Sequence, residues 1–327
     1  MLPSLQGLDL PRIQRLRSVF LAGPAAGRAV ADYWRDVRDL EAYDAVLAER
    51  IGWKWRAALE ECRERGFAPP ANARVLDYGC GTGIALRRYL EVYDAGEVVC
   101  HDRSLHATRF AVDRLRAAHP ELDVQAADGR LDGPFDVVLA SHLLSELDRR
   151  GLERFEQIVR SARLVLLVES GNRQASRRLS ALRDSLLASG NDGFEVVAPC
   201  PHGGPCPALA VESEWCHFFA TPPGEVFTDG DWVRAARELQ IDLRSLPYSF
   251  LAVRRRSDGD GESTPCDAAG ASTRWLGRAR VTPRSAELRG CSSEGLVAAD
   301  VSKRSQRELW RSIKKHPERL RGLPRLD

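Results

Sequence analysis

Two kinds of hydrophobic spacing alternate along this 327-residue chain. Residues 28–60 are rich in Ala, Leu, Arg and Glu, and Pro69 and Pro70 follow them, so residues 1–70 are expected to form a helical region. From residue 74 to about 195, short apolar runs alternate with stretches of helical spacing. This alternation predicts an α/β fold in which helices cover both faces of a parallel sheet.

The apolar runs locate five consecutive strands of this sheet. They lie around residues 75–76, 97–100, 123–127, 135–140 and 164–168. A long helix is expected over residues 173–187. Further along, a helix over 231–239 and a strand over 248–253 are the pair that would complete a seven-stranded sheet.

A glycine-rich turn, Asp77-x-Gly79-x-Gly81-x-Gly83, follows the first strand. Glycine adopts backbone conformations that other residues avoid, and a ligand can approach its bare backbone beside the unpaired N–H groups of a helix start. Ile84 stands where the dinucleotide-binding fingerprint needs glycine or alanine. The spacing instead resembles the first motif of class I S-adenosylmethionine (SAM) dependent methyltransferases, which implies that the loop receives the methionine part of SAM. The alternative is an ordinary strand-to-helix turn.

Two further acids follow the second and third strands. Asp102 lies nineteen residues after Gly83, close to the spacing at which a carboxylate accepts two hydrogen bonds from a ribose. The methyltransferase resemblance assigns this position to the SAM ribose, and it assigns the position of Asp128 to the adenine amino group. The alternatives are a surface acid at a strand end for Asp102 and a simple Asp-Gly turn for Asp128.

Ser141, His142 and Ser145 follow the fourth strand, on the rim where substrates enter an open α/β sheet. Amino-methylating enzymes often carry an Asn/Asp-Pro-Pro-aromatic motif here, and carbon-methylating enzymes use a Pro-Cys pair, but this chain has neither. His142 is a candidate general base. A histidine satisfied by contacts at a helix start is the favoured interpretation, so no catalytic residue is assigned.

Composition describes a globular chain with unevenly placed charge. It is 43% hydrophobic and 29% charged, and it has no apolar run of 18 residues, so neither a transmembrane helix nor a membrane partner is expected. Residues 1–23 lack a signal-peptide core and are interpreted as the start of the helical region, with an arginine-bearing mitochondrial transit peptide as the alternative. The net charge is only +2, yet residues 273–327 carry fourteen Lys and Arg against six Asp and Glu. This excess favours an anionic partner, nucleic acid first, and a solvated basic surface is the alternative.

Eight cysteines in a chain of this kind suggest metal or redox chemistry more than disulfides. Cys200, Cys206 and Cys216 lie close together in a segment rich in proline and glycine. Three thiolates on such a rigid loop suit tetrahedral zinc or an iron–sulfur cluster, although small buried cysteines in an apolar loop are the alternative. The candidates for a fourth ligand are His202, His217, Cys266 and Cys291.

Two cysteine motifs resemble those of a known family. Residues 200–207 read Cys-Pro-His-x-x-Pro-Cys-Pro and residues 215–218 read Trp-Cys-His-Phe. Inserted late in a class I methyltransferase fold, they are similar to the methyltransferase-like assembly factors of the small ribosomal subunit, which occur in mitochondria and bacteria. The resemblance covers roughly residues 30–315. It implies a [4Fe–4S] cluster on the three loop cysteines and Cys291, with zinc as the alternative. Four cysteine ligands would close such a cluster and argue against radical-SAM chemistry.

The motifs divide the chain into consecutive regions. These are an N-terminal helical region (1–70), a SAM methyltransferase-like domain (71–256) with a Cys-rich insertion (198–220), a linker (257–272) and a basic C-terminal β module (273–327). Small and polar residues make 257–272 a linker, so Cys266 within it is a poor ligand. The module is expected to hold short strands over 275–301 and a basic helix over 307–315, which suits contact with a phosphate backbone.

Two functions follow from these features. One is a SAM-dependent enzyme that methylates small-subunit ribosomal RNA, which the glycine turn and Asp102 favour. The other is a non-catalytic assembly factor that binds SAM and ribosomal RNA, which the missing methylation motifs favour. The basic C-terminal module argues against a third function, an enzyme for small molecules with structural zinc. We expect a monomer in the bacterial cytoplasm or, in a eukaryote, in mitochondria.

Overall fold

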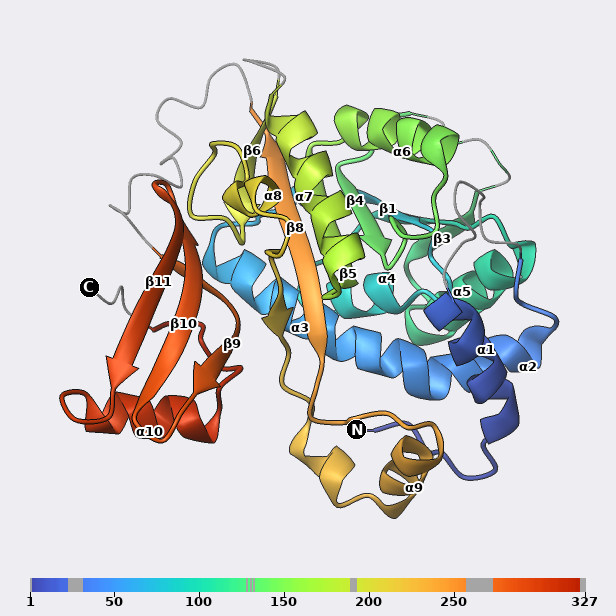
Figure 1. The fold of residues 1–327 in the computed structure, drawn as a ribbon. Coiled ribbons are helices and arrows are strands. Elements are labelled where there is room, and N and C mark those ends of the chain that lie inside the picture. Colours follow the sequence, from blue (N-terminus) through green and yellow to red (C-terminus); the bar gives the residue numbers. More distant parts are fainter. Residues whose placement is uncertain are drawn as a thin grey trace. The chain divides into compact units, whose positions relative to one another are not determined.

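The computed structural model describes residues 2–22, 32–127, 129, 131, 133–188, 193–256 and 273–323. The chain forms two compact units. Figure 1 labels their helices and strands. Unit 1 comprises Met1–Arg63, Ala68–Val168 and Ala220–Leu246, and unit 2 comprises Glu64–Phe67, Glu169–Phe219 and Pro247–Asp327. Each unit is therefore assembled from segments that are discontinuous in the sequence.

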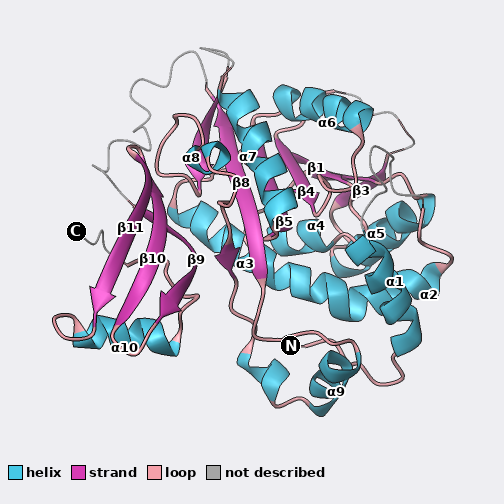
Figure 2. Ribbon diagram, viewed as in Figure 1, coloured by secondary structure: helices cyan, strands magenta, loops and turns pink. Residues whose placement is uncertain are grey.

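Unit 1 contains parallel strands in the order β3-β2-β1-β4-β5 (Figure 2). They are β1 (Arg74–Tyr78), β2 (Glu97–His101), β3 (Asp123–Ala126), β4 (Val137–Ser141) and β5 (Leu164–Ser170). Each pair of neighbouring strands in this order is parallel. The order reverses between β1 and β4, and in open α/β sheets ligands bind beyond the carboxyl ends of the strands at such a reversal. The α/β fold that the hydrophobic spacing predicts is confirmed.

Three helices of unit 1 begin at aspartate caps. The helices described in this unit are α1 (Leu10–Ala22), α2 (Val37–Tyr43), the π-helix η1 (Asp44–Ala48), α3 (Glu49–Glu64), α4 (Ile84–Tyr89), α5 (Leu105–Ala118), α6 (Arg149–Ser161), the 3-10 helix η3 (Gly224–Phe227) and α9 (Gly230–Glu238). The carboxylates of Asp36, Asp148 and Asp229 accept N–H bonds in the first turns of α2, α6 and α9. The expected N-terminal helices are confirmed for the described residues.

Aromatic residues of α3 form part of the core of unit 1. Trp53 and Trp55 are buried, and the ring of Trp53 lies 5.2 Å from that of Trp232 in α9, measured between centroids. A segment near residue 230 therefore packs on a helix that ends before β1 begins. None of the described helices combines the length and the apolar character that crossing a membrane requires.

Unit 2 contains the remaining strands and helices. They are α7 (Arg173–Leu187), β6 (Phe194–Ala198), α8 (Pro207–Ala210), β7 (Phe218–Phe219), β8 (Pro247–Arg255), β9 (Arg274–Val281), β10 (Ser285–Ser292), β11 (Gly295–Ser302) and α10 (Arg307–Lys315). Strand β8 pairs antiparallel with both β6 and β7. Strands β9, β10 and β11 form a separate antiparallel sheet in which β10 lies in the middle.

Helix α10 covers one face of this three-stranded sheet. Trp310 and Ile313 stand three positions apart, which places both on one side of the helix, and both are buried. They join Trp275 and Leu288 of the sheet in one apolar cluster. The other side of α10 is polar, so the helix is amphipathic, and its bounds match the helix expected over 307–315.

Strand β6 is absent from the strands that the hydrophobic spacing predicts. It is only five residues long, and its antiparallel partner β8 begins almost fifty residues later, so no local spacing signals the pairing. The predicted linker at 257–272, with Cys266, lies outside the described residues.

Candidate functional site

The turn between β1 and α4 is the glycine loop (residues 79–83). Gly79, Gly81 and Gly83 have φ angles of +76°, +53° and +75°, a left-handed region that side chains with a Cβ rarely adopt. The first two N–H groups of the loop donate to the carbonyl oxygen of His101 at 2.7 and 3.0 Å. These bonds hold the loop against the end of β2.

The three glycines differ in what surrounds them. A Cβ on Gly79 would lie 2.8 Å from Leu143 Cδ1, and one on Gly83 would lie 3.1 Å from the Cβ of Ala111. A Cβ on Gly81 would meet no heavy atom within 4 Å. Gly79 and Gly83 are therefore required for packing, whereas Gly81 faces open space in which a ligand could lie against the backbone.

Asp102 is tied directly to the glycine loop. Its Oδ2 accepts a hydrogen bond from the N–H of Gly81 at 3.0 Å, and its Oδ1 accepts one from Ser104 at 2.9 Å. Burial raises the pKa of Asp102, and these two N–H donors oppose the shift. The structure thus brings Asp102 and Gly81, which are twenty-one residues apart, into one site.

The other two acids predicted to bind the cofactor are Asp77 and Asp128. Asp77 is completely buried in β1, and burial raises its pKa to about 7. Its position inside the sheet suits support of the turn rather than direct contact with a ligand. Asp128 lies outside the described residues.

An acidic and aromatic group near Asp102 escaped the sequence reasoning. The hydroxyl of Tyr33 donates to Glu146 Oε1 at 3.4 Å, and the Arg103 guanidinium lies 3.6 Å from Glu146 Oε2. The same guanidinium stacks over the Tyr33 ring at 5.4 Å from its centroid. Burial raises the pKa of Glu146 to about 7. These residues come from distant segments, and no motif in the sequence signals their meeting.

The end of β4 holds Ser141 and His142 beside the glycine loop. Trp55 Nε1 donates to Ser141 Oγ at 2.9 Å. His142 adopts a φ of +54°, and burial lowers its pKa well below the usual value, so its imidazole is neutral at pH 7. A non-glycine residue with such a φ carries strain. The geometry does not place a reacting atom beside His142, and no catalytic residue is assigned.

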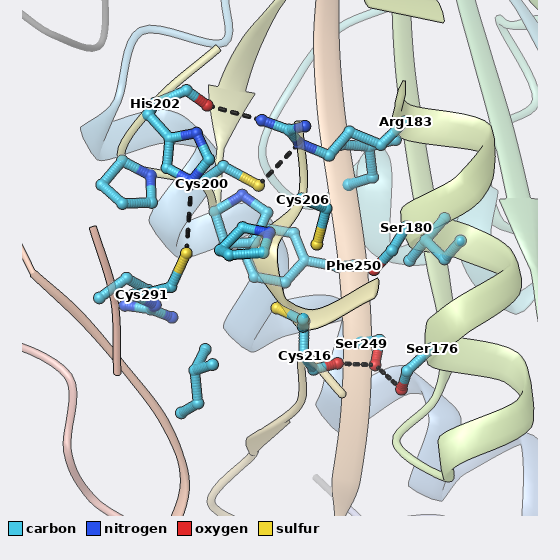
Figure 3. A pocket seen from close by; sticks show the side chains of 18 residues that line it. Ser176, Ser180, Arg183, Cys200, His202, Cys206, Cys216, Ser249, Phe250 and Cys291 are labelled. Atoms are coloured by element: carbon cyan, nitrogen blue, oxygen red, sulfur yellow. Dashed lines mark hydrogen bonds between the residues drawn. The ribbon is translucent and has the colours of Figure 1, made fainter. Parts of the chain in front are cut away.

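In unit 2, the side chains of Cys200, Cys206, Cys216 and Cys291 line one cavity (Figure 3). The first two flank the turn between β6 and α8, the third precedes β7, and the fourth lies in β10. Three neighbouring cysteines are thus joined by one that is seventy-five residues away in the sequence. We call this the cysteine cavity.

The thiols of the cysteine cavity oppose one another electrostatically. Burial raises the pKa of Cys216 well above its usual value, and the charges of the other three thiolates raise it further. Burial raises the pKa of Cys291 to about 12. Four thiolates can share this space only if a cation neutralises them. The donor set therefore fits a thiophilic metal centre.

The second half of α7 supplies a charged pair to the wall of the cavity. Arg183 Nε lies 3.2 Å from Cys200 Sγ, and its other nitrogens donate to the carbonyl oxygens of His202 and Gly204 at 2.7 and 2.8 Å. The N–H of Cys206 donates to both carboxylate oxygens of Asp184 at 2.9 and 3.1 Å. Sequence reasoning did not identify this pair, because an Arg-Asp dipeptide on a helix is common.

Two of the four candidates for a fourth ligand line the cysteine cavity in the described part of the chain. Cys291 and His202 both line the cavity, and His202 Nε2 lies 3.3 Å from Cys291 Sγ. His217 stacks instead on Trp215, with ring centroids 4.9 Å apart. Cys266 lies outside the described residues. Within the described ranges, no three His, Cys, Asp or Glu side chains are placed to hold a single metal ion.

A basic surface lies on the polar side of α10 and the turn before it. Its exposed cations are Lys303, Arg304, Arg307, Arg311, Lys314 and Lys315. The ammonium groups of Lys303 and Lys314 lie 4.8 and 5.0 Å from the centroid of the Trp310 ring. The buried indole thus helps to hold two of these cations in place. We call this set the α10 basic surface.

Comparison with known proteins relates most of the chain to one family. Residues 50–316 match the family model described as mitochondrial small ribosomal subunit Rsm22. The human mitochondrial ribosome assembly protein METTL17 is 28% identical over an alignment of 233 residues, and the match covers 63% of this chain and 49% of that protein. The ribosomal protein L11 methyltransferase of Bordetella parapertussis is 38% identical over 78 residues, which are 24% of this chain and 25% of that enzyme. The chain thus spans half or less of the length of these curated relatives.

The chain is also similar to solved structures at low identity. One is a putative RNA methyltransferase from Pyrococcus horikoshii, with 14% identity and a TM-score of 0.40, over 62% of this chain and 83% of that one.

Proposed function

The chain belongs to the Rsm22 family of the mitochondrial small ribosomal subunit, and we propose that it binds small-subunit ribosomal RNA during subunit assembly. The match over residues 50–316 carries this proposal. The similarity to METTL17, a ribosome assembly protein of human mitochondria, supports it. In the proposal, SAM occupies the glycine loop and an iron–sulfur cluster occupies the cysteine cavity.

The SAM site would use the glycine loop together with Asp102. Gly79 and Gly83 set the shape of the turn, and the open space at Gly81 leaves the backbone accessible to the methionine part of SAM. Asp102 would accept hydrogen bonds from the ribose hydroxyls with the carboxylate that it already aims at the loop. Asp77 would support the turn from strand β1. Asp128 would bind the adenine amino group, as its place in the motif implies.

The iron–sulfur cluster would be held by Cys200, Cys206, Cys216 and Cys291. A single tetrahedral zinc ion, with Zn–S bonds of about 2.3 Å, would draw four sulfurs to within about 3.8 Å of one another. No three donor side chains in the described part of the chain are placed for one ion. In a four-iron cluster each thiolate would bind a different iron, whereas zinc, the alternative, would take all four thiolates on one ion. When bound, the cluster would supply a rigid crosslink between the loop and β10.

The α10 basic surface would contact the RNA backbone. Six exposed cations on one helix and its preceding turn give a concentrated positive potential, and only Glu308 interrupts the helix with an acid. Backbone contacts position a protein on RNA without reading the sequence. This matches an assembly factor that recognises a folded stage of the subunit.

Methylation of the RNA is the second candidate function. Two features favour methylation: the space beside Gly81 is open, and the Gly81 N–H donates to Asp102. Together they form a site that can hold a methyl donor. The described residues at the end of β4 hold no Asn/Asp-Pro-Pro or Pro-Cys motif, which favours binding without transfer.

The test is transfer of labelled methyl groups from SAM to small-subunit precursors purified from a strain that lacks this protein. The protein is prepared without oxygen, and Gly81→Arg serves as the matched control. Label that enters RNA only with the unmodified protein establishes the enzyme. Absence of label, with SAM binding and precursor binding measured separately, establishes the assembly factor. Failure of the protein to bind the precursors would overturn the ribosomal proposal itself.

A further inference from the structure

Arg183 is a cation enclosed in the wall of the cysteine cavity. Only 3% of its side chain is exposed, and such burial of a charge is costly unless partners compensate it. Its partners are the Cys200 sulfur at 3.2 Å, two loop carbonyl oxygens, and Asp184 Oδ1 at 2.5 Å. The side chain thus donates a hydrogen bond directly to a cysteine sulfur (Figure 3). An arginine that only braces a loop would not need this contact.

Asp184 pairs directly with Arg183 and shares its carboxylate with the loop. Its Oδ1 lies 2.5 Å from the Arg183 guanidinium, both of its oxygens also accept the N–H of Cys206, and its side chain is 28% exposed. The Nε–H of Arg183 is directed instead to the Cys200 sulfur at 3.2 Å. An arginine side chain keeps its proton at pH 7, so this contact brings a positive charge to the sulfur.

We propose that Arg183 is the electrostatic partner of the metal centre in the cysteine cavity, raising its reduction potential and slowing its loss through the N–H bond to the Cys200 sulfur. This inference rests on the proposed cluster. Four thiolates make such a centre negative, and one-electron reduction adds a further negative charge. A fixed positive charge therefore stabilises the reduced form more than the oxidised form. Hydrogen bonds to sulfur and nearby charge are established determinants of these potentials.

Arg177 provides a matched control on the same helix. Its guanidinium donates to the carbonyl oxygens of Ala208, Leu209, Val211 and Glu214 at 2.8 to 3.0 Å. It therefore braces the same Cys-rich segment through four bonds to backbone oxygens, where Arg183 makes two. Its replacement tests the removal of bracing while every bond to sulfur is kept.

The experiment compares wild type, Arg183→Gln, Arg183→Lys and Arg177→Gln, all purified without oxygen. Iron and sulfide per chain are measured first. The midpoint potential is then obtained by titration with dithionite, followed by electron paramagnetic resonance. The rate of iron release to a chelator is measured on the same samples. Circular dichroism reports whether each variant is folded.

We expect Arg183→Gln to lose iron about 10- to 100-fold faster than wild type, the usual effect of removing an outer partner of a metal site. We expect its reduced form to be disfavoured about tenfold, which is about 59 mV for a one-electron couple. Arg183→Lys keeps the charge and should keep the potential of wild type. Arg177→Gln should keep the potential as well.

Each outcome decides between distinct ideas. Wild type without an iron–sulfur centre would overturn the proposed cluster. A wild-type centre whose potential and release rate are unchanged in Arg183→Gln would overturn only the role of Arg183. If Arg183→Gln holds too little iron for titration, the release rates decide. Equal losses in Arg183→Gln, Arg183→Lys and Arg177→Gln would show that Arg183 merely braces the loop.

Discussion

The glycine loop of unit 1 and the cysteine cavity of unit 2 are assembled in different ways. The loop is a run of consecutive residues between β1 and α4, and its hydrogen-bond partners His101 and Asp102 lie together at the end of the adjacent strand β2. The cavity takes side chains from α7, from the turn before α8, from the segment before β7 and from β10. Strands β8 and β9 also line the cavity. One site depends on local backbone geometry, and the other depends on several separate segments folding correctly.

This difference predicts how each site responds to change. Damage to the glycine loop at Gly81 should abolish a ligand site and leave the rest of unit 1 intact, because a Cβ at this open position meets no other atom. Damage to the cavity should affect folding as well as binding, because a metal centre that joins distant segments contributes folding energy. The following predictions test this contrast, beginning with the largest expected effect.

The largest effect is expected for Cys291→Ser, which removes the ligand most distant in sequence. We expect most of the iron to be lost and the melting temperature of anaerobic protein to fall on the order of 5 °C. Iron analysis and calorimetry measure the two effects. Cys62→Ser, at a buried cysteine of α3 in unit 1, is the control and should keep its iron. Unchanged iron in Cys291→Ser would remove this residue from the ligand set.

Gly81→Arg should abolish SAM binding, with affinity reduced more than about 100-fold, because the side chain occupies the open space beside the loop. The left-handed φ of Gly81 adds a stability cost of about 1–2 kcal/mol. Gly83→Val should be destabilised more, because its Cβ also meets Ala111. Titration calorimetry and urea unfolding separate the two effects. Wild-type affinity in Gly81→Arg would exclude the glycine loop as the SAM site.

Asp77 should give unit 1 a distinct pH dependence. In the unfolded chain its carboxyl releases a proton near the usual pKa of 3.8, whereas burial keeps it protonated up to a pKa of about 7 in the folded protein. Between these values the folded state binds more protons, so its contribution to stability falls as pH rises and is lost above about pH 7. Asp77→Asn removes this pH dependence.

The measurement is urea unfolding of wild type and Asp77→Asn at pH 5 and pH 8 without SAM. Between pH 5 and pH 8 we expect the stability of the variant relative to wild type to increase by about 3 kcal/mol, because only the two pH units below the folded pKa of about 7 contribute. Glu146 titrates in the same range in both proteins and cancels in the comparison. A pH-independent difference would mean that Asp77 is already ionised in the folded state.

The smallest effect on stability, but a clear one on RNA, is expected from the double change Arg311→Glu and Lys315→Glu. Both side chains are exposed, so folding should be unaffected, while affinity for small-subunit RNA should fall. The slope of log K against log salt should decrease by about 0.7 to 0.9 for each phosphate that the variant no longer neutralises. Arg149→Glu, at a 93% exposed side chain of α6, is the control. Equal effects of both variants would mean that RNA binding does not depend specifically on α10.

Much of unit 1 is readable from the sequence because its signals are local. The apolar runs of β1, β2, β4 and β5 identify buried parallel strands, and the glycine spacing identifies the turn after β1. The short strand β6 was not predicted, because its pairing with β8 depends on residues far along the chain. The contact of Tyr33 and Arg103 with Glu146 escaped for the same reason.

For the cysteine cavity, the donor chemistry and the rigid loop could be predicted from the sequence, because the cysteines and the prolines and glycines around Cys200 and Cys206 are local features. Family resemblance, and not spacing, selected Cys291. Tertiary structure alone decided that Cys291 reaches the same cavity, that His217 does not line it, and that Arg183 touches a sulfur. Local periodicity reports which face of an element is buried, whereas the meeting of distant side chains is set by packing.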